Sequence, residues 1–135
     1  MVNTISKAEL STYAQEVFPG RIIVIQEETE AKKACDYLSK CEAIGFDTET
    51  RPAFRKGVTH QIALMQLSTI DTCFLFRLNL IGFPACLAEL LVNPVVKKIG
   101  LSLKDDFSAI HKRMSLAPAN FVELQSFVKD YGIED

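Results

Sequence analysis

Two apolar runs in the middle of the chain, residues 62–67 and 73–76, are separated by only five residues. Runs of this length that are rich in aliphatic and aromatic residues are typical of strands, and such a short connection makes the two strands antiparallel neighbours. We therefore expect a β-hairpin here. Any sheet that contains this hairpin is at least partly antiparallel, which already excludes an all-helical fold and a purely parallel sheet.

The segments around the hairpin alternate between strand-like and helix-like patterns. Strand-like runs lie at residues 21–25, 43–49, 95–101 and 120–124. Helical patterns lie at 31–38, 84–92 and 104–114, and a last one follows residue 124 through Val128 and stops at Gly132. The first helical pattern buries Ala31, Ala34, Cys35 and Leu38, and the second buries Leu87, Leu90 and Leu91. This order predicts an α/β domain of three layers with a mixed central sheet. Residues 1–20 are expected to form an N-terminal helical arm, with Ser6 as the cap.

Composition limits the class of protein. The 135 residues suffice for one domain with one core, and the net charge of −2 excludes a domain held on nucleic acid by overwhelming positive charge alone. The polar start and the lack of a long apolar stretch predict a cytoplasmic protein without a membrane segment. The four cysteines lack C-x-x-C spacing, which favours free thiols over a zinc site.

The strand-like run AIGFDTE, residues 43–49, ends in two carboxylates. Side chains alternate along a strand, so Asp47 and Glu49 share one face with Ala43 and Gly45. Like charges on one face repel, and an oxygen-preferring divalent cation such as Mg2+ or Mn2+ would keep both ionised. Solvated carboxylates at the end of a strand are the simpler interpretation of this segment alone.

A second acidic segment is GLSLKDDF, residues 100–107, where a strand-like run turns into a helix. Ser102 and Asp105 are three residues apart, which is capping-box-like spacing and favours a structural role for Asp105. Asp106 is rotated away from the helix's apolar stripe, so it is freer to lean over the end of the sheet. By itself this segment is typical of helix capping.

Taken together, these segments resemble the DEDD family of 3'-5' exonucleases, in the branch of ribonuclease D and the Werner syndrome exonuclease domain. The resemblance spans residues 21–133. IGFDTE at 44–49 resembles the first motif of the family, HQIALMQLS at 60–68 its next strand, and KKIGLSLKDD at 97–106 its second motif. The order and spacing of these three segments together favour the family over the simpler interpretation of each segment alone.

The resemblance implies an RNase H-like fold and an enzyme that hydrolyses phosphodiester bonds of DNA or RNA from a 3' end. Two divalent ions, Mg2+ or Mn2+, would carry the chemistry, with no small-molecule cofactor and a single-stranded or 3'-ended nucleic acid as partner. Asp47, Glu49 and Asp106 carry over as catalytic metal ligands, and the Thr48 backbone as a contact to the terminal nucleotide.

The family pattern also has a fourth acidic residue, in a Tyr-x-x-x-Asp or His-x-x-x-Asp motif on a later helix. Residues 131–135, YGIED, match that spacing, but Gly132 disfavours a helix there and the family motif lies several dozen residues farther on. The sequence therefore predicts a domain whose C-terminal part is missing, spanning residues 1–135, and a chain that is inactive by itself.

Basic residues near the acidic strand are candidates for a path along phosphates. Arg51, Arg55 and Lys56 lie in the loop that follows the strand, and Lys104 begins the later helix. A solvated loop face explains the three loop residues equally well. The basic residues at 97–98 and 111–113 are interpreted as ordinary surface charge.

Two other functions stay open at this point. One is a non-catalytic RNase H-like module that contacts nucleic acid or a protein, and the other is a different RNase H-like metal nuclease, such as an endonuclease. Neither the choice between DNA and RNA nor the oligomeric state follows from the sequence.

Overall fold

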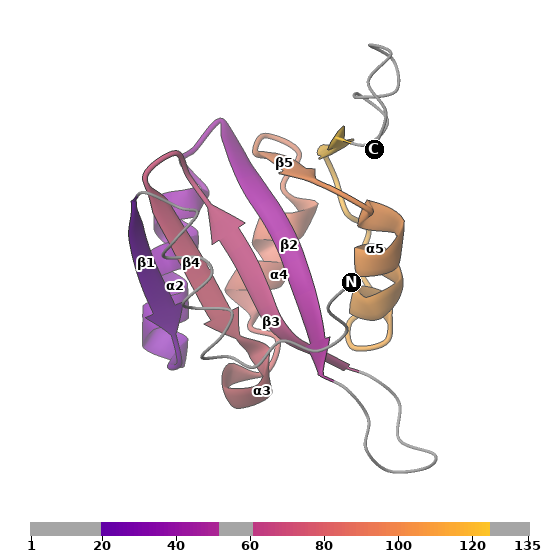
Figure 1. The fold of residues 1–135 in the computed structure, drawn as a ribbon, viewed down its shortest axis with the longest axis horizontal. Helices are drawn as coiled ribbons and strands as arrows, with labels where there is room; N and C mark the ends of the chain where they lie inside the picture. Colours follow the sequence, from indigo (N-terminus) through magenta and orange to yellow (C-terminus); the bar gives the residue numbers. More distant parts are fainter. Residues whose placement is uncertain (1–19, 52–60, 125–135) are drawn as a thin grey trace.

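The structure of the chain is a computed structural model that describes residues 20–51 and 61–124. Six strands and four helices make up this part of the chain (Figure 1). In chain order they are β1 (Arg21–Ile25), α2 (Glu28–Leu38), β2 (Ala43–Arg51), β3 (Gln61–Ser68), β4 (Thr72–Arg77), α3 (Leu78–Ile81), α4 (Ala85–Val92), β5 (Lys97–Gly100), α5 (Leu103–His111) and β6 (Phe121–Glu123). The expected arm at 1–20 and the last helix lie almost entirely outside the described residues.

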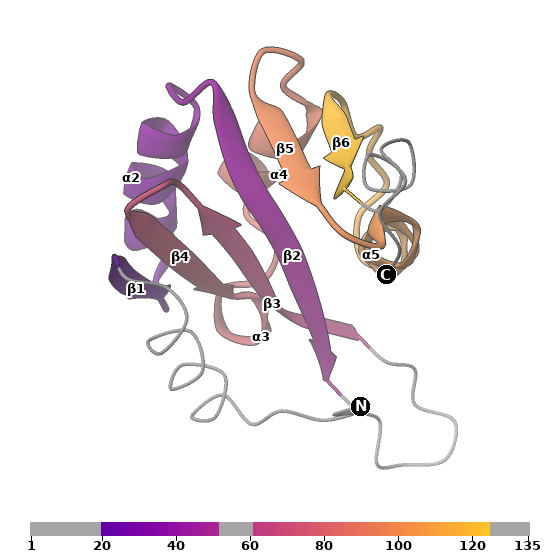
Figure 2. The same ribbon diagram turned by 45° about the horizontal axis from the view of Figure 1, so that its top comes forward.

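The strands form one mixed sheet in the order β1-β4-β3-β2-β5-β6. β3 is antiparallel to both β2 and β4, whereas β1 with β4, β2 with β5, and β5 with β6 pair in parallel. Figure 2 shows β5 beside β2, with β6 on the far side of β5. The predicted hairpin is confirmed as β3 and β4, and so is the predicted mixed α/β architecture. This order places β2, with its acidic residues, in the middle of the sheet.

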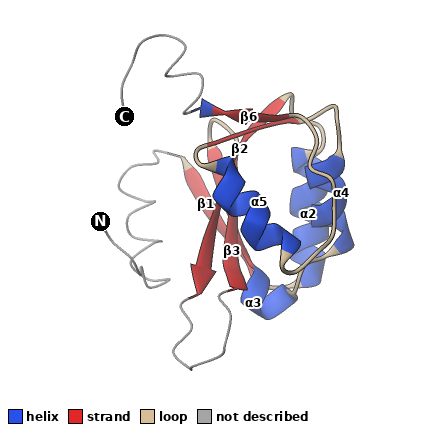
Figure 3. Cartoon of the chain, turned by 90° about the vertical axis from the view of Figure 1, so that its right-hand side faces the viewer, coloured by secondary structure: helices blue, strands red, loops and turns tan. Residues whose placement is uncertain are grey.

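The helices follow the apolar patterns of the sequence. α2 buries the four residues predicted for it, and α4 begins directly after Pro84 and buries its three predicted leucines. α5 ends at His111, earlier than the predicted 114, and the short α3 is not apparent from the sequence. α2 and α4 lie together on one side of the strands (Figure 3). In the described ranges, none of the helices is long and apolar enough to cross a membrane.

The two faces of the sheet carry different clusters. The large core lies between the sheet and the helices, and its strand residues include Ile44, Phe46, Phe74 and Phe76. A smaller apolar cluster lies on the opposite face, formed by Leu64, Cys73 and Leu75 with Ile22 and Val24 packed against it. Because side chains alternate along each strand, this second face also carries the alternate residues of β2, and the acidic pair among them.

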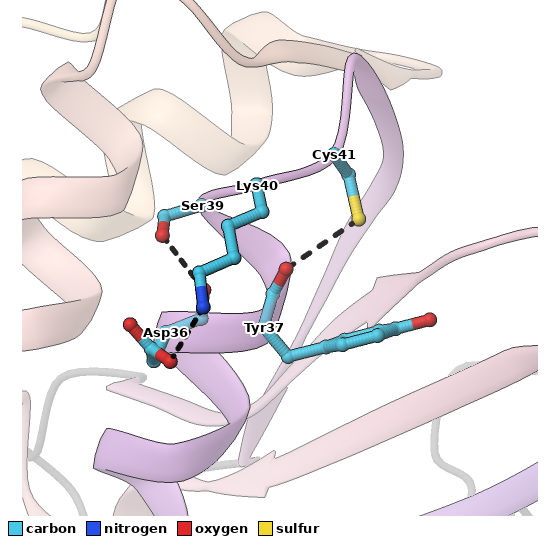
Figure 4. Close-up of polar contacts among 5 residues, drawn as sticks. All are labelled: Asp36, Tyr37, Ser39, Lys40 and Cys41. Atoms are coloured by element: carbon cyan, nitrogen blue, oxygen red, sulfur yellow. Dashed lines mark hydrogen bonds and ion pairs between the residues drawn. The ribbon is translucent and has the colours of Figure 1, made fainter.

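The end of α2 is held by local polar contacts (Figure 4). The Ser39 hydroxyl donates to the Asp36 carbonyl (2.8 Å), and the Lys40 ammonium forms an exposed ion pair with the Asp36 carboxylate (3.2 Å). The Cys41 thiol donates to the Tyr37 carbonyl (3.6 Å). The Ser39 and Cys41 contacts give partners to carbonyl groups in the last turn of the helix, where carbonyls lack intrahelical partners.

Two interpretations of basic residues as surface charge are wrong. Lys98 is fully buried, and its ammonium donates to the carbonyls of Leu90 (3.2 Å) and Asn93 (2.7 Å) at the end of α4. Arg113 is half-buried and its guanidinium donates to two carbonyls, those of Ile62 and Leu78. Both side chains bind carbonyls of a different element, so local sequence patterns give no sign of them.

Candidate active site

β2 places its two carboxylates on the second face of the sheet. Ile44 and Phe46 are buried in the core, whereas Asp47 and Glu49, on the opposite side of the strand, are exposed. The alternation predicted from the sequence is therefore confirmed. The strand register changes between Glu49 and Thr50. A bulge of this kind re-aims side chains and is common beside active sites.

A pocket of about 260 Å³ lies beside Asp47. It runs across β3, β2 and the end of β5, and its lining residues are Gly45, Phe46, Asp47, Gln66, Ser68, Ile99, Gly100, Leu101 and Leu124. Neighbouring atoms come close to two glycines of this lining. A Cβ atom on Gly45 would lie 2.5 Å from Ser68 Oγ, and one on Gly100 would lie 2.7 Å from the Phe46 carbonyl oxygen. These small residues leave room next to the carboxylate.

The surroundings of the two carboxylates on β2 disfavour their ionised forms. Partial desolvation raises the pKa of Asp47, and a hydrogen bond from the Thr48 backbone N–H (2.9 Å) opposes that rise. Desolvation also raises the pKa of Glu49, and the negative charge of Asp47 raises it further. A cation placed between such groups would favour the ionised form of both.

Asp106 reaches the same region from α5. It is buried in the first turn of that helix, and the Thr48 hydroxyl donates a hydrogen bond to its Oδ1 atom. Burial raises the pKa of Asp106 to about 6, and the hydrogen bond from Thr48 opposes this rise. The negative charges of Asp47, Asp105 and Glu123 raise this pKa further. Thr48 therefore links β2 to α5, with Asp47 close enough to act on Asp106.

The prediction that Ser102 and Asp105 form a capping box at the start of α5 is wrong. Ser102, the residue before the helix, has a left-handed backbone (φ 55°), and its side chain makes no capping hydrogen bond. Instead, the backbone N–H groups of Ser102 and Leu103 donate to the two carboxylate oxygens of Glu123, at 3.1 and 2.8 Å. Glu123 lies on β6, so the only sequence signal for it was an acidic residue at the end of a short predicted strand.

Comparison with known proteins identifies the family. Residues 22–132 match the family model described as 3'-5' exonuclease. The chain belongs to the 3'-5' exonuclease family. It is 29% identical over 117 residues to the mouse bifunctional 3'-5' exonuclease/ATP-dependent helicase WRN, a match that covers 79% of this chain and 8% of the mouse protein.

Solved structures with low sequence identity share the fold. The Trypanosoma brucei RNase D complex with RNA U12 superposes with a TM-score of 0.71 at 20% identity, over 86% of this chain and 41% of that one. The EXD2 exonuclease domain soaked in Mg and GMP gives a TM-score of 0.68 at 20% identity, over 82% and 60%. These likenesses establish an RNase H-like fold. The chain spans less than two thirds of each relative.

The other predicted contact residues of this exonuclease-family chain are only partly described. Thr48 is half-buried, with its hydroxyl directed toward Asp106, and Lys104 is exposed on the first turn of α5. Arg55 lies outside the described residues, as do Lys56 and the segment 131–135. The path for phosphates along the loop after β2 therefore stays a prediction.

The acidic residues fit a divalent metal in part. Asp47 and Glu49 supply oxygen donors on one face, the ligands that Mg2+ and Mn2+ prefer, and their raised pKa values indicate a site that a cation would stabilise. In residues 20–51 and 61–124, however, no three His, Cys, Asp or Glu side chains form a group that could hold a metal ion. Asp106 is instead hydrogen-bonded to Thr48.

Proposed function

We propose that this chain is the catalytic part of a divalent-metal-dependent 3'-5' exonuclease that hydrolyses phosphodiester bonds of DNA or RNA. The observation that carries the proposal is the acidic pair Asp47 and Glu49 on the second face of the sheet, beside a pocket of about 260 Å³. Family membership supports nuclease chemistry, and the RNA in the RNase D complex supports a nucleic acid as substrate.

In this proposal the protein mainly binds and orients. Asp47 and Glu49 hold the cations, Asp106 adds a third carboxylate, and the Thr48 hydroxyl fixes the rotamer of Asp106. The backbone around Thr48 and the glycine-lined pocket would receive the terminal nucleotide. Lys104, which is exposed on the first turn of α5, would contact the phosphate. Two divalent cations bound there would activate the attacking water and stabilise the leaving 3' oxygen. No side chain needs to act as a nucleophile.

The fourth acidic residue of the DEDD pattern is the open part of this proposal. After Asp106, the Tyr-x-x-x-Asp or His-x-x-x-Asp spacing occurs in this sequence only at 131–135. We propose that this match is fortuitous and that the 135 residues alone bind metal weakly and cleave poorly. Metal-dependent cleavage by the 135 residues that Asp47→Asn abolishes would contradict this part of the proposal.

The test compares the 135-residue chain with an extended chain that also contains the residues following Asp135 in the natural reading frame. Both are incubated with a 3'-labelled single strand of DNA or RNA and Mn2+ or Mg2+. Stepwise release of label by the extended chain, lost in Asp47→Asn, is the expected result. A 5'-labelled strand distinguishes exonuclease from endonuclease cleavage.

Two neighbouring aspartates provide a matched control. Asp106→Asn should lower the rate strongly, whereas Asp105→Asn, one position earlier and exposed, should leave it near that of the unmodified protein. Retained binding of the strand without cleavage, in every metal, would instead favour a non-catalytic nucleic-acid-binding module.

A further inference from the structure

The connection between β5 and α5 is a tight turn held at two points. At its start, Gly100 lies so close to the Phe46 carbonyl and to Leu103 that a Cβ atom would clash with both. At its centre, Ser102 has φ 55° and ψ 42°, a conformation that non-glycine residues adopt only where the surroundings impose it. The direction in which α5 leaves the sheet depends on this turn.

Glu123 is the group that holds the second point. The parallel register of β5 and β6 pairs Gly100 with Glu123, which brings the glutamate beside the turn. Its Oε2 accepts from Ser102 N–H (3.1 Å) and its Oε1 accepts from Leu103 N–H (2.8 Å). Hydrogen bonds to a charged acceptor are stronger than neutral ones, and a negative charge at the start of a helix is further favoured by the helix dipole.

The same turn determines where Asp106 lies. Asp106 is in the first turn of α5, so a change in the start of the helix moves its carboxylate relative to Thr48 and Asp47. Ser102 makes no side-chain capping bond that could replace Glu123. A carboxylate that accepts from two consecutive N–H groups fixes both the position and the rotation of the helix start. A single hydrogen bond would leave the rotation free.

We propose that Glu123 is a positioning residue for the exonuclease reaction, which acts by holding the turn at Ser102 and Leu103 so that Asp106 keeps its hydrogen bond with Thr48 and its place near Asp47. This inference rests on the proposed function, because it assigns Glu123 a role toward that active site. Glu123 itself need not touch substrate or metal. Its position on β6 separates it in sequence from Asp47, Glu49 and Asp106.

The first measurement uses the 135-residue chain and needs no activity. In Glu123→Gln one carboxylate oxygen becomes an NH2 group, so one of the two N–H groups loses its acceptor. In 1H–15N spectra we expect the amide protons of Ser102 and Leu103 to move upfield, with smaller changes along α5 and none in α2. Unchanged Ser102 and Leu103 resonances would overturn the inference, whatever the activity of the protein.

The second measurement uses the extended chain on a 3'-labelled strand. We expect Glu123→Gln to lower kcat about tenfold or more through misplacement of Asp106. KM should stay within about twofold, since a purely positional defect leaves ground-state binding intact. The matched control, Glu42→Gln, removes the same charge from an exposed site before β2 and should match the unmodified protein.

Two further outcomes separate the possible failures. A lower melting temperature in Glu123→Gln with unchanged kcat would reduce Glu123 to a structural residue and overturn the inference. An unmodified extended chain without activity would contradict the proposed function, while the amide resonances would still report on the turn.

Discussion

The two faces of the central sheet differ in what fixes their side chains. On the face covered by helices, large apolar residues such as Phe76 and Leu67 are fully buried and leave little freedom for any neighbour. On the other face, the apolar cluster near β1 and β4 gives way at β2 to Asp47 and Glu49, which are exposed. Packing fixes the side chains of the first face, whereas the carboxylates on the second face are suited to binding a positively charged ligand.

Polar groups on the packed face have hydrogen-bond partners. Lys98 and Arg113 reach into the packed region and bind carbonyls of α4, β3 and α3. Throughout the described ranges, every buried side-chain nitrogen or oxygen has a hydrogen-bond partner. On β2, in contrast, the negative charge of Asp47 raises the pKa of Glu49, an arrangement that costs stability unless a ligand uses it. Substitutions on the acidic face should therefore change activity more than stability, and substitutions on the packed face should change stability.

The largest effect is expected on the acidic face, in activity rather than stability. Glu49→Gln removes a charge that the proposed function assigns to metal binding, and it should slow cleavage by the extended chain at least about 100-fold, equivalent to roughly 2.7 kcal/mol of transition-state stabilisation. Its free energy of unfolding should change by less than about 0.5 kcal/mol, because Glu49 is exposed. Label release and urea unfolding measure the two quantities. A variant that loses stability and activity together would break the comparison.

On the packed face, Lys98 should make stability depend on pH. Burial lowers its pKa from 10.5 to about 8. Below pH 8 the amine is protonated in both the folded and the unfolded chain, and between pH 8 and 10.5 only the unfolded chain binds the proton. Rising pH therefore stabilises the folded chain over that window, and falling pH removes this gain.

Cysteine thiols also ionise at alkaline pH and add their own pH dependence to the stability. The Lys98→Met variant contains the same cysteines, so comparison with it isolates the effect of Lys98. Between pH 7 and pH 10 the unfolding free energy of the unmodified chain should rise relative to that of the variant by about 2–3 kcal/mol. Urea unfolding at both pH values gives the difference. A constant difference between the two proteins would mean that Lys98 is not desolvated.

The smallest expected effect is the difference between two added methyl groups. Gly100→Ala places a Cβ 2.7 Å from the backbone oxygen of Phe46, which cannot move, and should destabilise the chain by about 1–3 kcal/mol. Gly45→Ala meets only the Ser68 hydroxyl on the second face, which can rotate away, so its cost should stay below about 1 kcal/mol. Thermal unfolding of both variants measures the contrast, and equal losses would contradict it.

Much of the fold could be predicted because its signals are local. The buried stripe of α2, the proline before α4 and the short connection between β3 and β4 each lie within a few residues of the element that they define. The alternation that places Asp47 and Glu49 on one face is local as well. These predictions are confirmed, although the end of α5 moved and the short α3 was not predicted.

The incorrect predictions concern contacts between distant segments. Glu123 caps a helix from a strand that follows it, and Lys98 binds the carbonyls of the preceding helix, so the residues next to either one do not reveal the contact. Ser102 and Asp105 have the right spacing for a capping box, but the left-handed turn at Ser102 prevents it. The metal-binding roles of Asp47, Glu49 and Asp106 stay predictions that the proposed experiments address.

The pairing of β1 with β4 has a consequence for the order in which the chain is made. Among the strands of residues 20–51 and 61–124, β1 pairs only with β4, and the whole of α2, β2 and β3 lies between them in the sequence. A ribosome that synthesises the chain from its N-terminus releases Arg21–Ile25 well before Thr72–Arg77 exists. During that interval an apolar strand without its partner is available for wrong pairings, and the native sheet can close at this edge only after the hairpin is complete.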